Sequence, residues 1–265
     1  MNFLRRELAP IGDLGWSAID AMAKDVLAAN LSARRFVDVD GPHGIGHAAV
    51  VLGRLAMPDK QAGAVHYGIH RVLPLVEMRV PFRLGIWELD NLSRGAADVD
   101  LAPLVAACRE IAAFEEKAVY EGFKPAGIAG LQAAAKDRKV KAALDTNGIV
   151  EAVSAAQARM LKDGVGGPAN LVVSPAIWTF LARGVPGGTL RIIVERLIGG
   201  RVIPSETVRD ALLVAGRGGD MILTVGQDFA IGYHGATATE VELFLTESFT
   251  FRVVAPEALV ALSLG

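Results

Sequence analysis

Cysteine, aromatic residues and long apolar runs are all scarce in this sequence, and each shortage narrows what the protein can be. Cys108 is the only cysteine among 265 residues, so an internal disulfide is excluded, as is common in a reducing cytoplasm. Aromatic residues amount to 6% of the chain. No run of about 18 or more uncharged apolar residues occurs, so the sequence predicts no membrane-spanning helix and no membrane partner.

An excess of one charge is also lacking. The chain has 27 Lys and Arg residues against 29 Asp and Glu residues, for a net charge of −2. No block of like charge stands out, so composition does not support nucleic-acid binding. The first residues, MNFLRREL, have no apolar core after their arginines. We therefore expect no secretory signal and a cytoplasmic protein.

Apolar residues, in contrast, are abundant and make up 52% of the chain. A chain of 265 residues forms one large domain or two modest ones. Because so much apolar surface must be buried, we expect part of it to lie between subunits. Cys108 is expected to be a small buried side chain in a helix, since no histidine and orienting group can be placed beside it.

The periodicity of apolar residues predicts an α+β fold. A stripe at spacings of three and four predicts a helix that Asp13 caps and that runs to about Leu31. Asp100 and Pro103 open a second long helix, which Gly122 ends. An α/β region and a β-rich tail follow. Four glutamates on the second helix are expected to form a solvated or interfacial face: Glu110, Glu115, Glu116 and Glu121.

Strict alternation of apolar and polar residues from Val76 to Ile86 predicts a strand. Pro74 and Pro81 cannot donate ladder hydrogen bonds, so this strand should lie at a sheet edge or in a ribbon. With the preceding strand, AAVVLGRLA, it is expected to form a two-stranded arm. Because such a ribbon is marginal in water, it needs a surface to lie on, and a neighbouring subunit would provide one.

Motifs for metal binding and catalysis are weak. His43 and His47 are four residues apart, a spacing that binds zinc on a helix, but the surrounding Pro42 and glycines favour a loop. His66 and His70 share that spacing in a segment without helical signals. No phosphate-binding glycine loop and no nucleophile elbow occurs. We therefore expect no metal site, no catalytic residue and no enzyme.

A charged cluster follows the alternating strand in the stretch WELDNLSRG, 87–95. Two carboxylates beside an arginine suit either an active site or a subunit boundary. Because the strand before the cluster requires a partner surface, the charges favour a boundary at which ion pairs set the register. The predicted assembly interface consists of Arg79, Arg83, Trp87, Glu88, Asp90 and Arg94.

Five stretches along the chain carry a resemblance to a known family. They are FLRRELAPIGDLGWSAID, RRFVDVDGP, LPLVEMRVPFRL, GGDMILTVGQDFAIGY and ELFLTESFTFRVVAPEAL. In this order they resemble the encapsulins, shell proteins of bacterial and archaeal nanocompartments whose early members were described as linocin-type bacteriocins. The chain departs from the family at GPHGIGH, where many relatives have a Trp, and in the glycine-rich stretch 185–189.

The resemblance implies the fold of tailed-phage major capsid proteins. Residues 1–47, an N-terminal helix and linker, would belong to a peripheral domain with 85–123 and 227–253. Residues 48–84 would form the extended loop, and 124–226 with 254–265 the axial domain. Many copies would assemble with themselves under icosahedral symmetry into a cytoplasmic shell.

The resemblance also implies a cargo enzyme, such as a dye-decolourising peroxidase or a ferritin-like protein, recruited through its C-terminal targeting peptide. The implied cargo-docking residues are Arg34, Val37, Asp38, Asp228 and Ile231. The implied pore loop consists of Gly184, Val185, Pro186, Gly187 and Gly188. No cofactor is expected, although some relatives hold a flavin near a Trp that matches Trp87, and the presence of Trp87 and Arg79 would permit one here.

Two other hypotheses fit parts of the sequence. A prophage major capsid protein would have the same fold around DNA, but the near-neutral charge and the encapsulin-like stretches favour the first hypothesis. A soluble hydrolase would use the acidic cluster at 87–94, and a strongly shifted carboxyl pKa in a concave pocket would support it.

Overall fold

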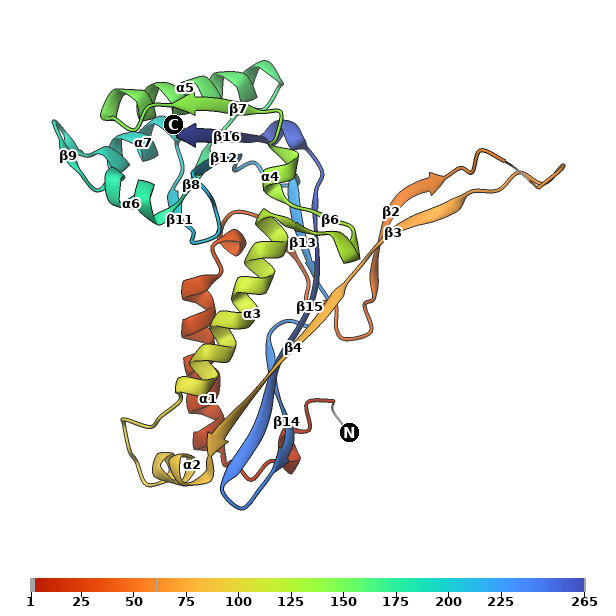
Figure 1. The fold of residues 1–265 in the computed structure, drawn as a ribbon, viewed down its shortest axis with the longest axis vertical. Helices are drawn as coiled ribbons and strands as arrows, with labels where there is room; N and C mark the ends of the chain where they lie inside the picture. Colours follow the sequence, from red (N-terminus) through yellow and green to blue (C-terminus); the bar gives the residue numbers. More distant parts are fainter. Residues whose placement is uncertain (1–2, 61, 265) are drawn as a thin grey trace.

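Two long helices pack side by side against a sheet in one half of the computed structural model, which describes residues 3–60 and 62–264 (Figure 1). The helices are α1 (Asp13–Asn30) and α3 (Ala102–Tyr120). Buried Ile19, Ala23 and Leu27 recur every four residues on α1, so they form one face toward the core. The expected cap is wrong: Gly12 is the N-cap and Asp13 lies in the first turn, where its charge favours the helix dipole.

The sheet of this half is organised around one long strand, β15 (Glu240–Val253). β4 (Val76–Gly85) pairs antiparallel with it over Glu240–Phe249, and β14 (Ala230–Ala236) and β13 (Met221–Val225) also pair antiparallel with it. β1 (Asp38–Asp40) adds to β13 in parallel. Because neighbours pair with β15 and helices cover the sheet, both faces of β15 are buried over most of its length.

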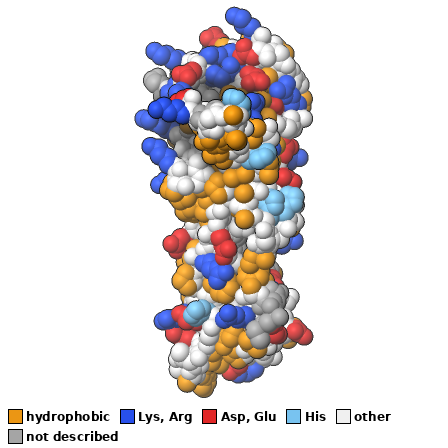
Figure 2. Space-filling model, turned by 90° about the vertical axis from the view of Figure 1, so that its right-hand side faces the viewer, with side chains coloured by type: hydrophobic (Ala, Val, Ile, Leu, Met, Phe, Trp, Pro, Cys, Tyr) orange, Lys and Arg blue, Asp and Glu red, His pale blue; other side chains and the backbone are white. Residues whose placement is uncertain are grey.

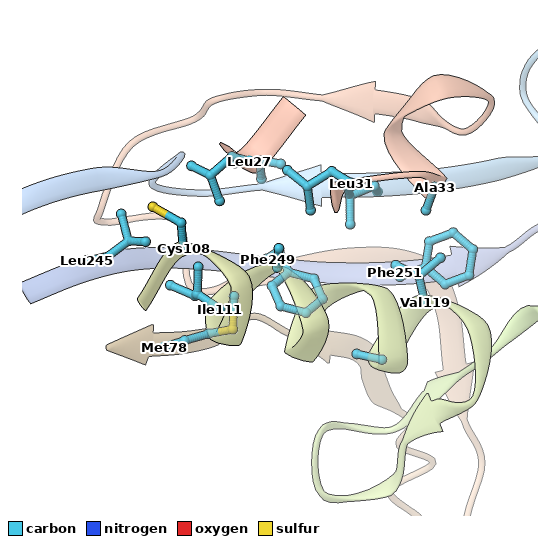
Figure 3. Packing of buried hydrophobic residues seen from close by; sticks show 14 of the residues in the cluster. Leu27, Leu31, Ala33, Met78, Cys108, Ile111, Val119, Leu245, Phe249 and Phe251 are labelled. Carbon is cyan, nitrogen blue, oxygen red and sulfur yellow. The ribbon is translucent and has the colours of Figure 1, made fainter. Parts of the chain in front are cut away.

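The main core lies between α1, α3, β4 and β15. Figure 3 shows Leu27 and Leu31, Met78, Ile111 and Phe249 pointing toward one another from these elements. Cys108 is among them and is fully buried in α3, as expected. Burial raises the pKa of its thiol to about 11, so the thiol stays protonated and unreactive at neutral pH.

The other half is an α/β unit with a second core. Its sheet has the strand order β11-β8-β12-β16-β7, and helices α5, α6 and α7 pack against it (Figure 1). The bounds are β7 Lys139–Ala142, α5 Thr146–Lys162, β8 Ala169–Val173, α6 Pro175–Leu181, α7 Leu190–Ile198, β11 Val202–Pro204, β12 Ala211–Ala215 and β16 Leu259–Leu264. Short elements complete the chain: α2 Ile86–Ser93, β5 Gly122–Phe123, β6 Ile128–Ala129, α4 Leu131–Ala134, β9 Gly184–Val185 and β10 Gly188–Thr189.

A two-stranded arm projects sideways from the junction of the two halves (Figure 1). It consists of β2 (Ala49–Ala56) and β3 (Ile69–Pro74), paired antiparallel. The expected pairing of 76–84 with the preceding strand is therefore wrong, because β4 pairs with β15 instead. β13 likewise lies beside β15, although its residues were expected in the axial segment 124–226. Ile86 begins α2 rather than ending the strand.

The arm carries apolar side chains that are at least half exposed to solvent in a single chain. Figure 2 shows hydrophobic side chains on the face from which the arm projects. On opposite strands, Val51 and Val72 are Cα partners in the ribbon and are 66% and 50% exposed. Leu55 and Ile69 are also at least half exposed. Val51, Val72 and Leu55 share one face of the ribbon by this pairing, while Ile69 lies on the other. Exposed apolar side chains gathered on an arm mark a protein contact surface.

No helix within residues 3–60 or 62–264 has the length and apolarity needed to cross a membrane. Exposed large apolar residues in this part of the chain lie on the arm, on loops and singly on helices such as α1, α3 and α5.

We expect Phe249→Ala to lower the free energy of unfolding by about 3–5 kcal/mol, because it opens a cavity between β15 and α3. Phe249 is fully buried, whereas Phe114 on α3 is 38% exposed. Phe114→Ala is therefore the matched control and should cost clearly less. Denaturant unfolding of both variants checks this expectation, and equal losses would contradict the position of the core.

Candidate functional site

A groove of about 460 Å³ lies between α1 and β14. Its floor is apolar because core residues of α1 and of the sheet also line it. They are Ala23, Leu27 and Leu31 from α1 and its C-cap, and Ile231 and Leu245 from β14 and β15. Its rim is charged and contains Arg6, Asp20, Lys24, Arg34 and Asp228. An apolar floor with a charged rim suits a short peptide better than a small polar metabolite.

Arg34 anchors one end of this groove. It follows α1 in a short 3-10 turn, Ala33–Arg35. Its Nε and Nη2 donate to the two carboxylate oxygens of Glu115 at 3.0 and 2.6 Å, and its Nη1 donates to Asp228 at 3.0 Å. Nη2 also donates to Glu247. One guanidinium therefore joins the end of α1, α3, β15 and the turn before β14.

Three acidic side chains surround the single guanidinium of Arg34, so its charge does not match theirs. Glu115 and Glu247 are both fully buried, while Asp228 is partly exposed. Burial and then the charge of Glu115 raise the pKa of Glu247 well above its usual range, although Arg34 opposes the shift. Burial would lower the pKa of Arg34, but the hydrogen bond and charge of Glu115 and the charges of Glu247 and Asp228 raise it. Among these carboxyls, burial therefore favours the neutral form of Glu247.

The expectation that the glutamates of α3 form a solvated or interfacial face is wrong for two of them. Glu115 and Glu116 are buried, whereas Glu110 and Glu121 are exposed. The sequence contained a signal: Glu115 falls in the apolar stripe of the helix, three and four residues after Ala112 and Ile111. Glu247 likewise interrupts the apolar positions of β15.

Of the five expected docking residues, the structure brings three together. Arg34, Asp228 and Ile231 line the groove. Val37 is only 7% exposed and belongs to the core. Asp38 lies on β1, where its carboxylate accepts a hydrogen bond from Gly219 N at 2.6 Å. Neither Val37 nor Asp38 lines the groove.

The groove is bordered by β14, an edge strand whose outer side Leu4 occupies in part. Tyr233 N donates to Leu4 O at 2.7 Å, so the peptide groups of Tyr233 face away from β15. Residues alternate in an antiparallel ladder, so Ile231, two residues earlier, presents its N–H and C=O on the same edge. Backbone groups beside an apolar floor are the arrangement that accepts an extended peptide as an added strand.

Of the expected assembly cluster, Trp87, Glu88 and Asp90 lie on α2, and Arg94 follows its last turn. Two of these residues already make hydrogen bonds within the chain. Glu88 accepts a hydrogen bond from Asp100 N at 3.1 Å, and Arg94 donates to Asn91 at 2.6 Å. Trp87 is 75% exposed, and Asp90 is exposed as well. Glu88 is thus held by Asp100 N and Asn91 within the chain, which favours a structural role for this carboxylate over a hydrolase site.

The two arginines expected in that interface lie on the outer face of β4. Arg83 pairs with Glu242 across the strands at 2.9 Å. Arg79 pairs with Glu77 at 2.9 Å and lies over the Phe244 ring, 4.9 Å from its centroid. Six strand residues separate Arg79 from the end of β4 before Trp87, about 20 Å. Arg79 and Trp87 therefore do not lie side by side in one chain.

The remaining expected segments are exposed. Gly184 to Gly188 form the β9–β10 hairpin, which projects from the α/β half (Figure 1). Gly187 and Gly188 have φ of 95° and 134°, which glycine adopts without strain.

His43 and His47 lie in a loop with ring centroids 4.7 Å apart. Residues 3–60 and 62–264 contain no group of three side chains suited to holding a metal ion.

We expect Arg34→Met to lower the free energy of unfolding by about 3–5 kcal/mol, because the buried carboxyl groups of Glu115 and Glu247 lose the guanidinium that contacts both. Arg34→Met with Glu247→Gln should recover part of the stability. Denaturant unfolding of both variants measures this, and a single variant as stable as the unmodified chain would contradict the network.

Comparison with known proteins agrees with this architecture. The family described as "Encapsulating protein for peroxidase" matches residues 1–250. The type 1 encapsulin shell protein of Rhodospirillum rubrum is 40% identical over 99% of this chain and 96% of its own length. That of Mycobacterium tuberculosis is 33% identical over 99% of this chain and all of its own.

Solved structures show the same fold at low identity. A virus-like particle from Pyrococcus furiosus aligns with a TM-score of 0.66 and 17% identity, covering 92% of this chain and 98% of that one. The capsid of Myoviridae phage XM1 aligns with a TM-score of 0.58 and 10% identity, covering 89% and 92%. The α+β arrangement is therefore the tailed-phage capsid fold. With relatives of high coverage that are shell proteins rather than enzymes, this chain belongs to the type 1 encapsulin shell proteins.

Proposed function

We propose that this chain closes into a shell that encloses a peroxidase, and that the groove between α1 and β14 binds the C-terminal peptide of that cargo. The single observation that carries the docking proposal is the apolar groove bordered by the open edge at Ile231. The family description, an encapsulating protein for peroxidase, supports a peroxidase over a ferritin-like cargo. The lone cysteine supports a cytoplasmic compartment.

An extended peptide suits this groove for two physical reasons. Its main chain would pair with the N–H and C=O of Ile231. These hydrogen bonds would give affinity that does not depend on the amino-acid sequence of the peptide. Its alternate side chains would bury apolar area on Leu27, Leu31 and Leu245. Charges at Arg6, Lys24 and Asp228 on the rim would then favour one orientation of the peptide.

Contacts between copies would come from the arm and from α2. The arm's exposed Val51 and Val72 would be covered by a neighbouring subunit, since a lone ribbon with this apolar surface is marginal in water. Trp87 would supply a large apolar anchor, and Asp90 and Arg94 would supply charges at the rim of the contact. The β9–β10 hairpin would line a pore where several copies meet.

A prophage capsid protein is the alternative for the same fold. Its support is the capsid of phage XM1, at 10% identity, which concerns the fold alone. The shell proteins at 33% and 40% identity favour the compartment.

We expect Val72→Asp to prevent shell closure, because the side chain is 50% exposed in one chain and its charge would be buried at the contact, at a cost of several kcal/mol. The folded chain should survive, since nothing in it covers this position. Size-exclusion chromatography with electron microscopy measures closure. Leu161→Asp on α5, where the leucine is 63% exposed, is the control. Normal shells from Val72→Asp would contradict the role of the arm.

We expect Ile231→Ala to weaken cargo loading about tenfold while shells still form, because Ile231 is 3% exposed and its truncation leaves a hole in the groove floor on which the peptide would lie. Ile222→Ala is the matched control, since Ile222 lies in β13 outside the groove. Co-expression with a peroxidase, with and without its C-terminal segment, followed by quantification of the enzyme in purified shells, measures loading. Equal loading of the truncated peroxidase would contradict peptide docking, whatever the shells look like.

A further inference from the structure

The first described residues of the chain pass along the outer edge of β14, beside the groove (Figure 1). Leu4 O accepts a hydrogen bond from Tyr233 N at 2.7 Å. Arg6, two residues further along, lines the groove itself. We name this segment, residues 4–8, the strap, because it lies both on the strand edge and on the rim of the groove.

The outer edge of β14 is occupied on both sides of Ile231. Every second residue of an antiparallel edge strand turns its N–H and C=O outward, so Phe229, Ile231 and Tyr233 share this edge. Phe229 N donates to the carboxylate of Asp228 at 2.9 Å, and Tyr233 N donates to Leu4. The position open to a partner therefore lies between them, at Ile231.

A peptide added as a strand at Ile231 soon reaches the strap. Tyr233 lies two residues from Ile231, about 7 Å along a strand. A peptide that pairs with Ile231 alone gains two backbone hydrogen bonds. The next pairing position needs Tyr233 N–H, which carries one hydrogen and already donates it to Leu4. A peptide strand longer than about three or four residues therefore competes with Leu4 for that hydrogen.

The side-chain contacts that hold the strap are weak. Arg6 Nη2 donates to the Asp20 carboxylate at 2.7 Å, and the Arg6 guanidinium lies 3.9 Å from the centroid of the Trp16 ring. The side chains of Arg6 and Asp20 are 31% and 49% exposed. An ion pair this exposed favours the closed strap by about fivefold at most, and the ring contact adds a factor of about two to five.

Backbone strain at Arg5 opposes these contacts. Arg5 has φ of 51° and ψ of 28°, in the left-handed region. Within residues 3–60 and 62–264 it is the one non-glycine residue with a positive φ. Relative to glycine, a residue with a Cβ disfavours this conformation by about fivefold or more. The closed strap is thus held by weak contacts against a local strain, which is the balance that a competing peptide can reverse.

We infer that the strap is displaced when cargo binds: the cargo peptide, added to β14 at Ile231, takes the Tyr233 hydrogen from Leu4 and releases residues 4–8. The inference rests on the peptide docking proposed above. It adds that the chain itself occupies part of the docking edge until a peptide long enough to pair beyond Ile231 replaces it. The apparent dissociation constant of such a peptide rises in inverse proportion to the fraction of copies whose strap is open.

Peptide titration of two variants at Arg5 tests the strap. Arg5 is exposed and does not line the groove, so neither variant removes a groove contact. Arg5→Gly relieves the strain of the closed strap and should weaken peptide binding about fivefold. Arg5→Ala is the matched control, because it loses the same charge but keeps the Cβ and the strain, and it should bind like the unmodified chain. The probe is a fluorescent synthetic peptide with the C-terminal residues of the co-expressed peroxidase, titrated into purified empty shells.

Hydrogen exchange of the same shells, with and without the peptide, measures release of the strap directly. Leu8 N donates to Arg5 O at 3.0 Å, and Ala9 N donates to Arg6 O at 3.1 Å. A single 3-10 turn has little stability of its own once it leaves the fold. Saturating peptide should therefore raise the exchange rates of the Leu8 and Ala9 amides at least about tenfold. The Tyr233 amide should stay protected, because a peptide carbonyl replaces that of the strap.

The outcomes separate failure of the strap from failure of the docking site. Peptide binding with unchanged exchange at Leu8 and Ala9 would overturn the strap and leave docking in the groove intact. Equal dissociation constants for Arg5→Gly and Arg5→Ala would do the same. A peptide that binds neither the unmodified shell nor either variant would overturn the docking proposal and the strap together.

Discussion

The β2–β3 arm imposes the constraint on which the function depends, because one chain cannot cover it. Val51, Leu55, Ile69 and Val72 lie at least half exposed on a ribbon that projects from the rest of the fold. A ribbon of two strands has no core of its own. Its stability must therefore come from other copies, and the closed shell of an encapsulin provides them in a repeating arrangement.

Inside the chain, buried ionic contacts hold the frame from which the arm extends. Arg34 joins α1, α3, β15 and the turn before β14 through three carboxylates. A neighbouring pair of contacts from Ser32 and Ala33 holds Glu116. Consecutive glutamates of α3 thus face two separate networks, both anchored in the short turn after α1. Because removing one partner of a buried pair costs more than the pair itself contributes, these networks specify where α1 meets the sheet.

Much of the fold could be predicted from local patterns. The apolar stripe of α1, the spacing from Ala102 to Tyr120 and the alternation of β4 each depend on residues a few positions apart. The partner of β4 could not be predicted in this way. A period of two indicates a strand but not which strand it pairs with, so β15 had to be found in the structure.

The site was harder to predict for the same reason. Arg34 meets Glu115 from 81 residues away and Glu247 from 213 residues away. A glutamate on an apolar stripe can be solvated at a subunit contact or paired inside the core. Which of the two occurs depends on whether a basic side chain from elsewhere in the sequence, here Arg34, reaches it. The docking residues Arg34, Asp228 and Ile231 came from the resemblance to encapsulins, and the structure brings them to one groove. The pattern of the residues alone did not indicate that groove.

Electron microscopy of the purified chain, combined with its particle mass in solution, tests the central claim most directly. If copies cover each other's arms, the chain forms closed hollow particles of one size at micromolar concentration, with almost no free subunit. A folded monomer or dimer that persists at that concentration would contradict the account, because the arm's apolar surface would then be stable in water without a neighbour.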